Sequence, residues 1–297
     1  MQNFELTASD GAPVACYRWD ADADSDLVLQ IAHGMGEHAQ RYDDVARQLA
    51  AAGITVYAND HRGHGETGRA HWGYMGGDGW NRTLADMYEL NRYIAEQHPQ
   101  ARRILLGHSM GAMLSQQYIT RHGTTIDGLV LSGSPGFKDP RGALITRLVA
   151  RFESWRLGPA AASPVLQKLL FGSANKPFDG AAATGFEWLS RDPEQVQKYI
   201  DDEGCGFVIS CASLVDMSRG TRTSSKPECC TSIPVELPVY VFSGTDDPVH
   251  SEKQDINRML QVYYAHGMTN IEVKWYEQGR HEMFNETNAD EVVTDLL

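Results

Sequence analysis

A serine flanked by glycines carries the strongest chemical signal in the chain. Residues 107 to 111 read G-H-S-M-G and match the G-x-S-x-G pattern of a nucleophilic serine. The pattern follows the apolar run RRILL and precedes a segment with helical spacing, which is the strand-turn-helix context that the chemistry needs. Ser109 is therefore the candidate nucleophile; the alternative is a glycine-rich turn whose serine only caps a helix.

Backbone N–H groups for a developing alkoxide are also available near this serine. An acyl transfer needs such donors, one directly after the nucleophile and one from a loop after an earlier strand. Met110 follows the serine, and the loop H-G-M-G at residues 33 to 36 follows the apolar run LVLQIA. We expect Met35 and Met110 to supply the two N–H groups; the alternative is a flexible loop with an incidental histidine.

An acid and a base follow in the order that this chemistry requires. In nucleophile-elbow hydrolases the chain order is serine, then Asp or Glu, then histidine. Asp246 and Asp247 come at the end of the apolar run VYVFSG, and His281 lies in a loop after the last apolar run. His250 belongs to the loop of the acid itself, and His266 lies in a helix-to-strand connection at the wrong end of the sheet. His281 is thus the preferred base.

The charge of the chain excludes one class of partner. The 297 residues carry 39 acidic and 26 basic side chains, a formal net charge of -13. Such a field opposes a long contact with a nucleic-acid backbone. No apolar run approaches the roughly 20 residues of a membrane span, and the first residues lack the pattern of a secretory signal. We expect a soluble, cytoplasmic protein.

The cysteines predict neither a disulfide framework nor a zinc knuckle. There are five, an odd number, and none forms a C-x-x-C pair. They are interpreted as reduced thiols. The adjacent Cys229 and Cys230 fit a plain loop pair better than a redox pair. We expect no metal and no cofactor.

The elements that must position these residues alternate between strand and helix. Residues 2 to 19 predict a hairpin turning at Asp10-Gly11. Further strands are predicted at LVLQIAH, ITVYAND, RRILLGHS, IDGLVLSGS, LPVYVFSGTDD and IEVKWYE, and helices are predicted over 42–52, 84–98, 113–123 and 253–266, with a short one at the end. This order predicts an α/β fold with a mostly parallel sheet covered by helices on both faces.

The alternation breaks between residues 137 and 230. This stretch contains helical segments at 143–157, 164–171 and 193–200 and no convincing parallel strand. We expect a helical cap here, inserted between two parts of one core at 1–136 and 231–297. The apolar side chains of the cap could line a tunnel for an acyl chain, but apolar residues at helical spacing more often form a core, so we expect most of them to be core residues. They are Phe137, Leu144, Leu148, Phe152, Trp155, Leu166, Leu170, Phe171, Phe178, Phe186 and Trp188.

Taken together, these motifs resemble those of monoacylglycerol lipases and related bacterial lysophospholipase-like esterases of the α/β-hydrolase superfamily. The resemblance lies in HGMGEHAQRY, NDHRGHGETG, GHSMGA, GTDDPVH and RHEMFNE, which come from both parts of the core and leave the cap unmatched. It implies Ser109 as nucleophile, Asp247 as acid, His281 as base, and the N–H groups of Met35 and Met110 as oxyanion donors. It also implies that the turn from Asp60 to Gly65 is structural.

The resemblance favours hydrolysis of monoacylglycerol or lysophospholipid esters through an acyl-enzyme, without a cofactor. The partner would be a small lipid ester, with possible transient contact between the cap and a membrane surface. Two other readings stay open on the residues alone. The same triad serves peptides, amides and thioesters, and a ligand receptor can keep the fold without the chemistry.

Overall fold

The computed structural model describes residues 1–21, 25–178, 180 and 183–297. At its centre lies an eight-stranded sheet. Its strand order is β1-β2-β4-β3-β5-β6-β7-β8. β1 and β2 are antiparallel, and the neighbours from β4 to β8 are all parallel. The bounds are β1 (Gln2–Thr7), β2 (Pro13–Trp19), β3 (Leu27–Ala32), β4 (Thr55–Asn59), β5 (Arg102–His108), β6 (Gly128–Ser132), β7 (Val239–Gly244) and β8 (Ile271–Tyr276). The predicted, mostly parallel sheet is confirmed.

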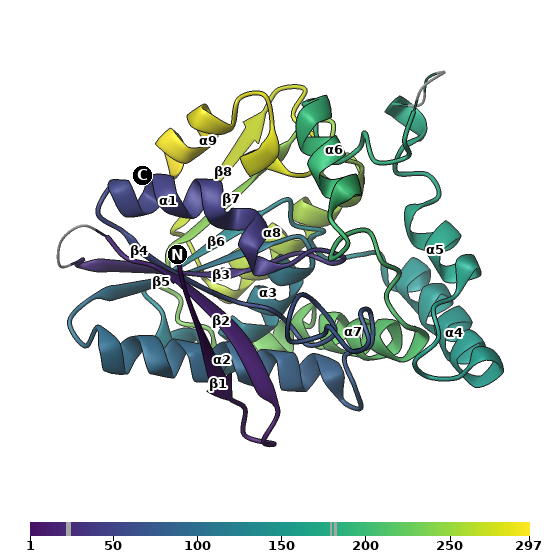
Figure 1. The fold of residues 1–297 in the computed structure, drawn as a ribbon, viewed down its shortest axis with the longest axis horizontal. Helices are drawn as coiled ribbons and strands as arrows, with labels where there is room; N and C mark the ends of the chain where they lie inside the picture. The colour runs from purple at the N-terminus through teal and green to yellow at the C-terminus, as the bar shows by residue number, and fades with distance from the viewer. Residues whose placement is uncertain (22–24, 179, 181–182) are drawn as a thin grey trace.

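Helices cover both faces of this sheet (Figure 1). α2 (Gly79–Gln97), α3 (Met110–His122) and α8 (Gln254–His266) share one apolar core with strand residues such as Leu105. α1 (Asp43–Ala51) and α9 (Ala289–Leu296) share a second core with Leu106. Successive strand residues point to opposite faces, so strands covered on both sides must be apolar throughout. This explains why the central strands appear in the sequence as continuous apolar runs.

Short 3-10 helices connect several of these elements. They are η1 (Ala39–Tyr42), η2 (Gly123–Thr125), η3 (Lys176–Phe178), η4 (Pro227–Ser232), η5 (Pro248–His250) and η6 (Met283–Asn285). The predicted hairpin joins β1 to β2, and Gly11 has a φ of +82° in its turn. That left-handed conformation is available to glycine without strain. The helix predicted from residue 84 begins five residues earlier, at Gly79.

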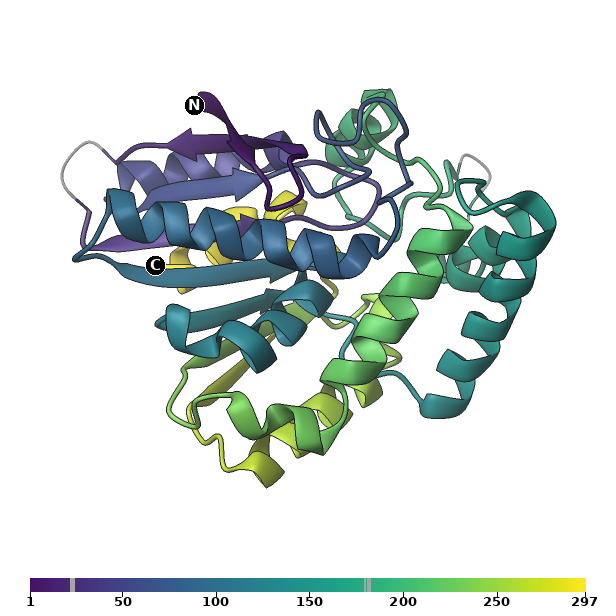
Figure 2. The ribbon, with the colours of Figure 1, turned by 90° about the horizontal axis from the view of Figure 1, so that it is seen from below.

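Residues 137–230 fold mainly as helices outside the sheet. They form α4 (Pro140–Leu157), α5 (Pro164–Phe171), α6 (Pro193–Asp201) and α7 (Cys211–Ser224). Within the described part of this range, the extended pairing is limited to an isolated bridge between Ala162 and Ser210. Figure 2 shows these helices gathered at the ends to which the parallel strand arrows point. The position of the insertion, at the carboxyl ends of the strands, is the one where α/β folds bind ligands.

The apolar side chains of this insertion are mostly not core residues. Of the apolar cap side chains named above, Phe137 and Leu166 are buried, whereas Trp155 is 81% exposed and Phe152 is 55% exposed. The interpretation that most of them form a core is wrong. The helical spacing is present, but on α4 it leaves Leu148, Phe152 and Trp155 exposed at the surface.

All five cysteines are free thiols, as expected. Cys230 is buried, and Cys229 is partly exposed. Across the described residues, the helices are all too short or too polar to cross a membrane.

Candidate active site

Ser109 lies in the sharp turn between β5 and α3. Its backbone has a φ of +53°, an unusual conformation for a residue with a side chain. The flanking glycines allow the close approach that this turn requires. A Cβ at Gly111 would lie 1.9 Å from the carbonyl oxygen of Ala32, and one at Gly107 would lie 2.4 Å from that of Gly111. The sequence pattern is therefore explained by sterics, and the turn holds the serine at the end of the central strand.

A hydrogen-bonded chain joins Ser109 to His281 and Asp247. The Ser109 Oγ lies 2.9 Å from His281 Nε2, and His281 Nδ1 lies 2.9 Å from Asp247 Oδ2. The carboxylate also accepts hydrogen bonds from the Ser243 hydroxyl at 2.9 Å and the Val249 N–H at 2.8 Å. The structure thus brings together the nucleophile, base and acid that the sequence suggested, from three separate loops.

Burial and charge shift the pKa values of Asp247 and His281 in opposite directions. Burial penalises the Asp247 carboxylate, but the adjacent His281 outweighs it and lowers the pKa of Asp247 to about 2. Burial likewise opposes the charged form of His281, and the carboxylate raises its pKa above the ordinary histidine value. Asp247 therefore stays ionised at neutral pH and favours a proton on the imidazole, which is the electrostatic arrangement of a general base and its partner.

The residues considered as rivals lie elsewhere. Asp246 is exposed, and its N–H donates to the carbonyl of Gly279. His250 Nε2 lies 3.0 Å from the Gly244 carbonyl oxygen, and its Nδ1 accepts from the N–H of Lys253. His266 Nε2 lies 2.9 Å from the carbonyl oxygen of Ile233, at the other end of α8. Neither histidine contacts Ser109.

The loop after β3 lies against the serine. A Cβ at Gly34 would lie 3.3 Å from the Ser109 Cβ, so the loop backbone passes close to the nucleophile. In the described chain, the N–H groups of Met35 and Met110 have no hydrogen bond to a protein acceptor. Met110 is the first residue of α3, where the N–H has no partner inside the helix. Both N–H groups are therefore free to bind a ligand oxygen.

A buried ion-pair network ties this loop to the loop of His281. Glu37 accepts hydrogen bonds from the Gly34 N–H and the Tyr42 hydroxyl. Arg41 Nη1 lies 2.7 Å from Glu37 Oε2. The same guanidinium donates to both carboxylate oxygens of Glu282, at 2.7 and 2.8 Å. The network was missed in the sequence, although the motifs HGMGEHAQRY and RHEMFNE contain its members. Their spacing along the chain gave no sign that Arg41 and Glu282 meet.

The turn from Asp60 to Gly65 is occupied with internal contacts. The Asp60 carboxylate accepts hydrogen bonds from the Tyr17 hydroxyl and the N–H groups of Ala39 and Glu66, each at 2.8 Å. His61 is buried with its ring centroid 4.1 Å from that of His33. The turn thereby packs beneath the loop after β3 and supports it, which agrees with a structural role.

A large cavity opens above the serine. It has a volume of about 1550 Å³ and extends from the loop after β3 to α7. Ser109 and His281 line its base, together with apolar side chains from both the core and the cap; among these are Met35, Met113, Phe137, Leu170, Phe186, Trp188, Phe207, Leu214 and Met217. Its size and apolar lining suit a small molecule with a long apolar part.

Trp188 connects the cap to the candidate base. Its ring centroid lies 5.0 Å from that of His281, and its carbonyl accepts the His281 N–H at 3.3 Å. The Arg280 guanidinium donates to the carbonyls of Glu187 and Ser190. The cap thus forms one wall of the site and holds the loop that carries His281.

Comparison with known proteins identifies the family of this chain. Residues 23–288 match the family model described as "Serine aminopeptidase, S33". A monoacylglycerol lipase of Mycolicibacterium smegmatis is 30% identical, with 94% of this chain and 89% of that protein aligned. A lysophospholipase of Escherichia coli is 30% identical over a shorter stretch, 43% of this chain and 38% of that protein.

A solved structure supports the same fold. A thermostable carboxyl esterase from Bacillus coagulans, determined in complex with glycerol, superposes with a TM-score of 0.90 at 26% identity and covers 99% of this chain and 96% of that one. This superposition spans the insertion as well as the core, and it confirms the α/β-hydrolase fold that the motifs implied. The chain belongs to the serine aminopeptidase S33 family of the α/β-hydrolase fold and, within it, is similar to monoacylglycerol lipases and lysophospholipases.

Proposed function

We propose that the protein hydrolyses carboxylic esters of a single acyl chain, of the monoacylglycerol or lysophospholipid type, through an acyl-enzyme on Ser109. The observation that carries the proposal is the chain of hydrogen bonds from Ser109 through His281 to Asp247 at the base of an apolar cavity. The names of the relatives, a monoacylglycerol lipase and a lysophospholipase among them, support the substrate class.

In the proposed first step, the Ser109 oxygen attacks the ester carbonyl while His281 Nε2 takes the hydroxyl proton. The carbonyl oxygen becomes an alkoxide, which the N–H groups of Met35 and Met110 stabilise. His281 then gives the proton to the departing alcohol oxygen, the C–O bond breaks, and the acyl group remains on the serine. Asp247 holds the imidazole with Nδ1–H toward itself and stabilises the imidazolium.

In the second step, water takes the place of the alcohol. His281 accepts a proton from the water as its oxygen attacks the acyl carbonyl, and it returns the proton to the Ser109 oxygen when the free acid leaves. Each cycle restores the serine and the imidazole, so side chains and backbone N–H groups are sufficient for the reaction.

We assign residues 137–230 the role of a lid that binds the acyl chain. Its side chains Leu170, Phe186 and Trp188 face the cavity together with core residues such as Met113. Each methylene buried there contributes up to about 0.8 kcal/mol. Ester turnover should therefore rise with acyl chain length until the cavity is filled.

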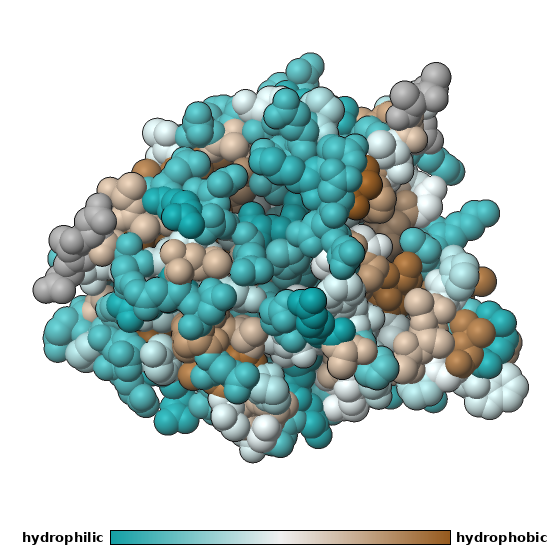
Figure 3. All heavy atoms as spheres, viewed as in Figure 1, coloured by the Kyte–Doolittle hydropathy of each residue, from teal (hydrophilic) through white to brown (hydrophobic). Residues whose placement is uncertain are grey.

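The lid also has an apolar outer surface, which we name the α4–α5 patch (Leu144, Ile145, Leu148, Phe152, Trp155, Val165 and Leu169). Every member is more than 40% exposed. Figure 3 shows brown side chains over these helices, on the side of the molecule away from the teal surface of the core. Such a patch marks an interaction site, and on a lipid ester hydrolase we propose that it touches the lipid surface from which the substrate comes.

A substrate panel tests the proposal. Purified protein is assayed with glyceryl monoesters and p-nitrophenyl esters of graded chain length, with a lysophospholipid, and with amide and aminopeptidase substrates. Ester kcat/KM that climbs with chain length and far exceeds amide turnover supports the proposal. Preferential cleavage of amino-terminal peptide bonds would instead fit the aminopeptidase in the family description and overturn the assignment.

A further inference from the structure

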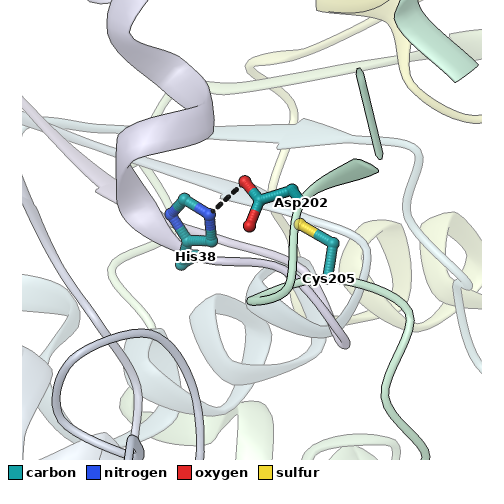
Figure 4. A group of neighbouring side chains, drawn as sticks. All are labelled: His38, Asp202 and Cys205. Atoms are coloured by element: carbon teal, nitrogen blue, oxygen red, sulfur yellow. Dashed lines mark hydrogen bonds and ion pairs between the residues drawn. The ribbon is translucent and has the colours of Figure 1, made fainter. Parts of the chain in front are cut away.

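Three side chains with metal-binding atoms meet where the lid touches the loop after β3. His38 comes from the segment just before η1, and Asp202 and Cys205 come from the loop that follows α6. Their ligand atoms all lie within 4.8 Å of one another, and no other such group of His, Cys, Asp and Glu occurs among the described residues. Figure 4 shows the three side chains pointing toward one another from the two segments.

We propose that this cluster binds a zinc ion that fastens the lid to the core. Imidazole nitrogen, carboxylate oxygen and thiolate sulfur are the ligands that Zn²⁺ uses in proteins, whereas Ca²⁺ and Mg²⁺ take oxygen ligands. The nitrogen and oxygen atoms are already adjacent, because His38 Nε2 lies 2.8 Å from Asp202 Oδ2. All three residues are partly exposed, so an ion can reach them and water can complete a tetrahedral set.

The charges around the cluster favour a cation. Asp202 lies in the acidic run Asp201-Asp202-Glu203 of a chain with a net charge of -13. Burial raises the pKa of the Cys205 thiol, and among the nearby charges Arg41 opposes this effect while Glu37 and Asp202 add to it. A metal ion bound to Cys205 would displace the thiol proton.

A nucleophilic cysteine is the alternative for these residue types, and the geometry disfavours it. The His38 imidazole is hydrogen-bonded to Asp202 and makes no hydrogen bond to Cys205 in the described structure. The cluster is thus better suited to hold a metal than to attack a substrate.

The cluster lies next to the proposed oxyanion loop, so a metal bound there would affect catalysis. The Gly206 N–H and the Tyr199 hydroxyl both donate to the carbonyl of Gly36, next to Met35, at 2.9 and 3.0 Å. The ligand loop of the lid therefore already lies on the proposed oxyanion loop. Metal bonds from both loops to one ion would resist their separation, so zinc should slow lid opening and lower turnover. This regulatory step rests on the proposed function, whereas zinc binding does not.

Binding is tested on the full-length protein after treatment with a chelator. Calorimetric titration with Zn²⁺ should give one ion per chain, and Co²⁺ should produce a near-ultraviolet thiolate charge-transfer band. Cys205→Ser and Asp202→Asn should each weaken binding at least about tenfold, the lower end of the loss expected even for supporting groups around a metal, and Cys205→Ser should remove the Co²⁺ band. Cys229→Ser, which changes a partly exposed cysteine outside the cluster, is the matched control.

Two further measurements keep the outcome decisive. Zn²⁺ should raise the Tm of the wild type and not that of Cys205→Ser, since an ion that binds only the native state stabilises it; Cys205→Ala replaces the serine variant if that one does not fold. No saturable binding, or equal binding by Cys205→Ser and the wild type, overturns the site.

Zinc should also lower the ester kcat of the wild type and leave that of Cys205→Ser unchanged. Binding without this effect overturns the link to the lid and leaves the site standing, and the binding result is independent of whether the protein is an esterase.

Discussion

Asp246 and Asp247 are neighbours in the chain but face different surroundings. Asp247 is 2% exposed and contacts His281, whereas Asp246 lies at the surface. Sequence order alone placed an acid in this loop and left both residues open; the choice of Asp247 came from the resemblance to a known loop motif. Orientation at a strand end depends on the local backbone, which composition and spacing do not reveal.

Asparagine substitutions separate the two aspartates. Asp247→Asn should lower kcat/KM by roughly 10³- to 10⁴-fold, because the imidazole loses the group that fixes its tautomer and stabilises its cation. Asp246→Asn should stay within about threefold of wild type, as expected for an exposed side chain without a partner in the triad. Ester kinetics at pH 8 measure both, and the reverse ranking would identify Asp246 as the acid.

The pH profile gives an independent check on the same variant. The carboxylate raises the pKa of His281, and the base must be unprotonated to act. The activity of wild type should therefore fall as the pH drops through that raised pKa, above the ordinary value near 6.5. In Asp247→Asn the acid limb of any residual activity should move to lower pH.

Ser109→Ala tests the nucleophile. The variant should fold normally, lose reactivity toward a fluorophosphonate probe and retain less than about 0.1% of turnover, since only binding and oxyanion stabilisation remain. Ser115→Ala, at a buried serine six residues further along the chain in α3, serves as the comparison. Retention by Ser109→Ala of even a tenth of the activity, a loss of only about 1.4 kcal/mol, would exclude an acyl-enzyme on this residue.

At the level of elements, the loops of the site depend on one another. Arg41 joins the loop after β3 to the loop of His281, and it also lies over the Tyr199 ring of α6, 4.8 Å from the centroid. A planar guanidinium can bind two carboxylates at once in a way that an ammonium cannot. We therefore propose that Arg41 is a positioning residue that sets the distance between the candidate oxyanion donors and the candidate base.

Arg41→Lys should retain the charge but lose the bridge. We expect kcat to fall about 10- to 100-fold with little change in KM, as for a displaced catalytic group, together with a lower Tm. Arg47→Lys is the matched control, because Arg47 is exposed and, among the residues that the structure describes, forms its ion pair with Asp43 across one helical turn. A change confined to Tm, with kcat unaltered, would reduce Arg41 to a purely structural ion pair.

The elements themselves were largely readable from the sequence, with one instructive omission. Buried parallel strands gave continuous apolar runs, and the Asp10-Gly11 turn marked the antiparallel hairpin of β1 and β2, so all eight strands were predicted near their observed positions. Helix α7 was missed because CASLVDMSRGTRTS is rich in Ser, Thr and Gly, which have poor helix propensity. It is stabilised instead by tertiary packing of residues such as Leu214 and Val215 in the core beside α2 and α3. The cavity wall formed by α7 could not be predicted for the same reason.

For the molecule as a whole, buried neutral histidines should make stability depend on mildly acidic pH. Burial lowers the pKa of His33 and His108 to about 4 and that of His64 to about 3. Between the ordinary pKa near 6.5 and these values, the unfolded chain binds protons that the native protein does not, so the free energy of unfolding must fall as the pH falls. His33 alone contributes roughly 3 kcal/mol across that window, at about 1.36 kcal/mol per pKa unit.

Urea unfolding between pH 8 and 4.5 measures this loss. The midpoint should be nearly constant from pH 8 to 7 and then decline steadily below 6.5. Stopping at 4.5 keeps carboxylates such as Asp247, whose pKa is lowered to about 2, from dominating the signal. His71→Gln, at an exposed histidine, should follow the wild-type curve. A flat midpoint down to pH 4.5 would mean that the buried imidazoles become protonated without unfolding.

We propose that the distribution of charge over the whole chain orients the protein at a lipid surface. Residues 137–178, which carry the α4–α5 patch, contain seven basic and two acidic side chains, a net charge of +5 in a chain of -13. The remainder is strongly acidic. An anionic surface should therefore repel the core and attract this part of the lid, where each basic side chain near the surface contributes about 1 kcal/mol and the exposed apolar side chains can insert.

Vesicle co-sedimentation tests this orientation. The protein should bind phosphatidylglycerol vesicles more tightly than phosphatidylcholine vesicles, and salt should reduce the difference by screening. Trp155→Ser removes the most exposed aromatic side chain of the patch and should weaken binding severalfold. Tyr264→Ser, which removes a side chain that is 50% exposed on α8, should not. Equal binding by the two variants would show that the protein meets lipid through a surface other than the α4–α5 patch, and the lid would then act only on substrate that reaches the cavity from solution.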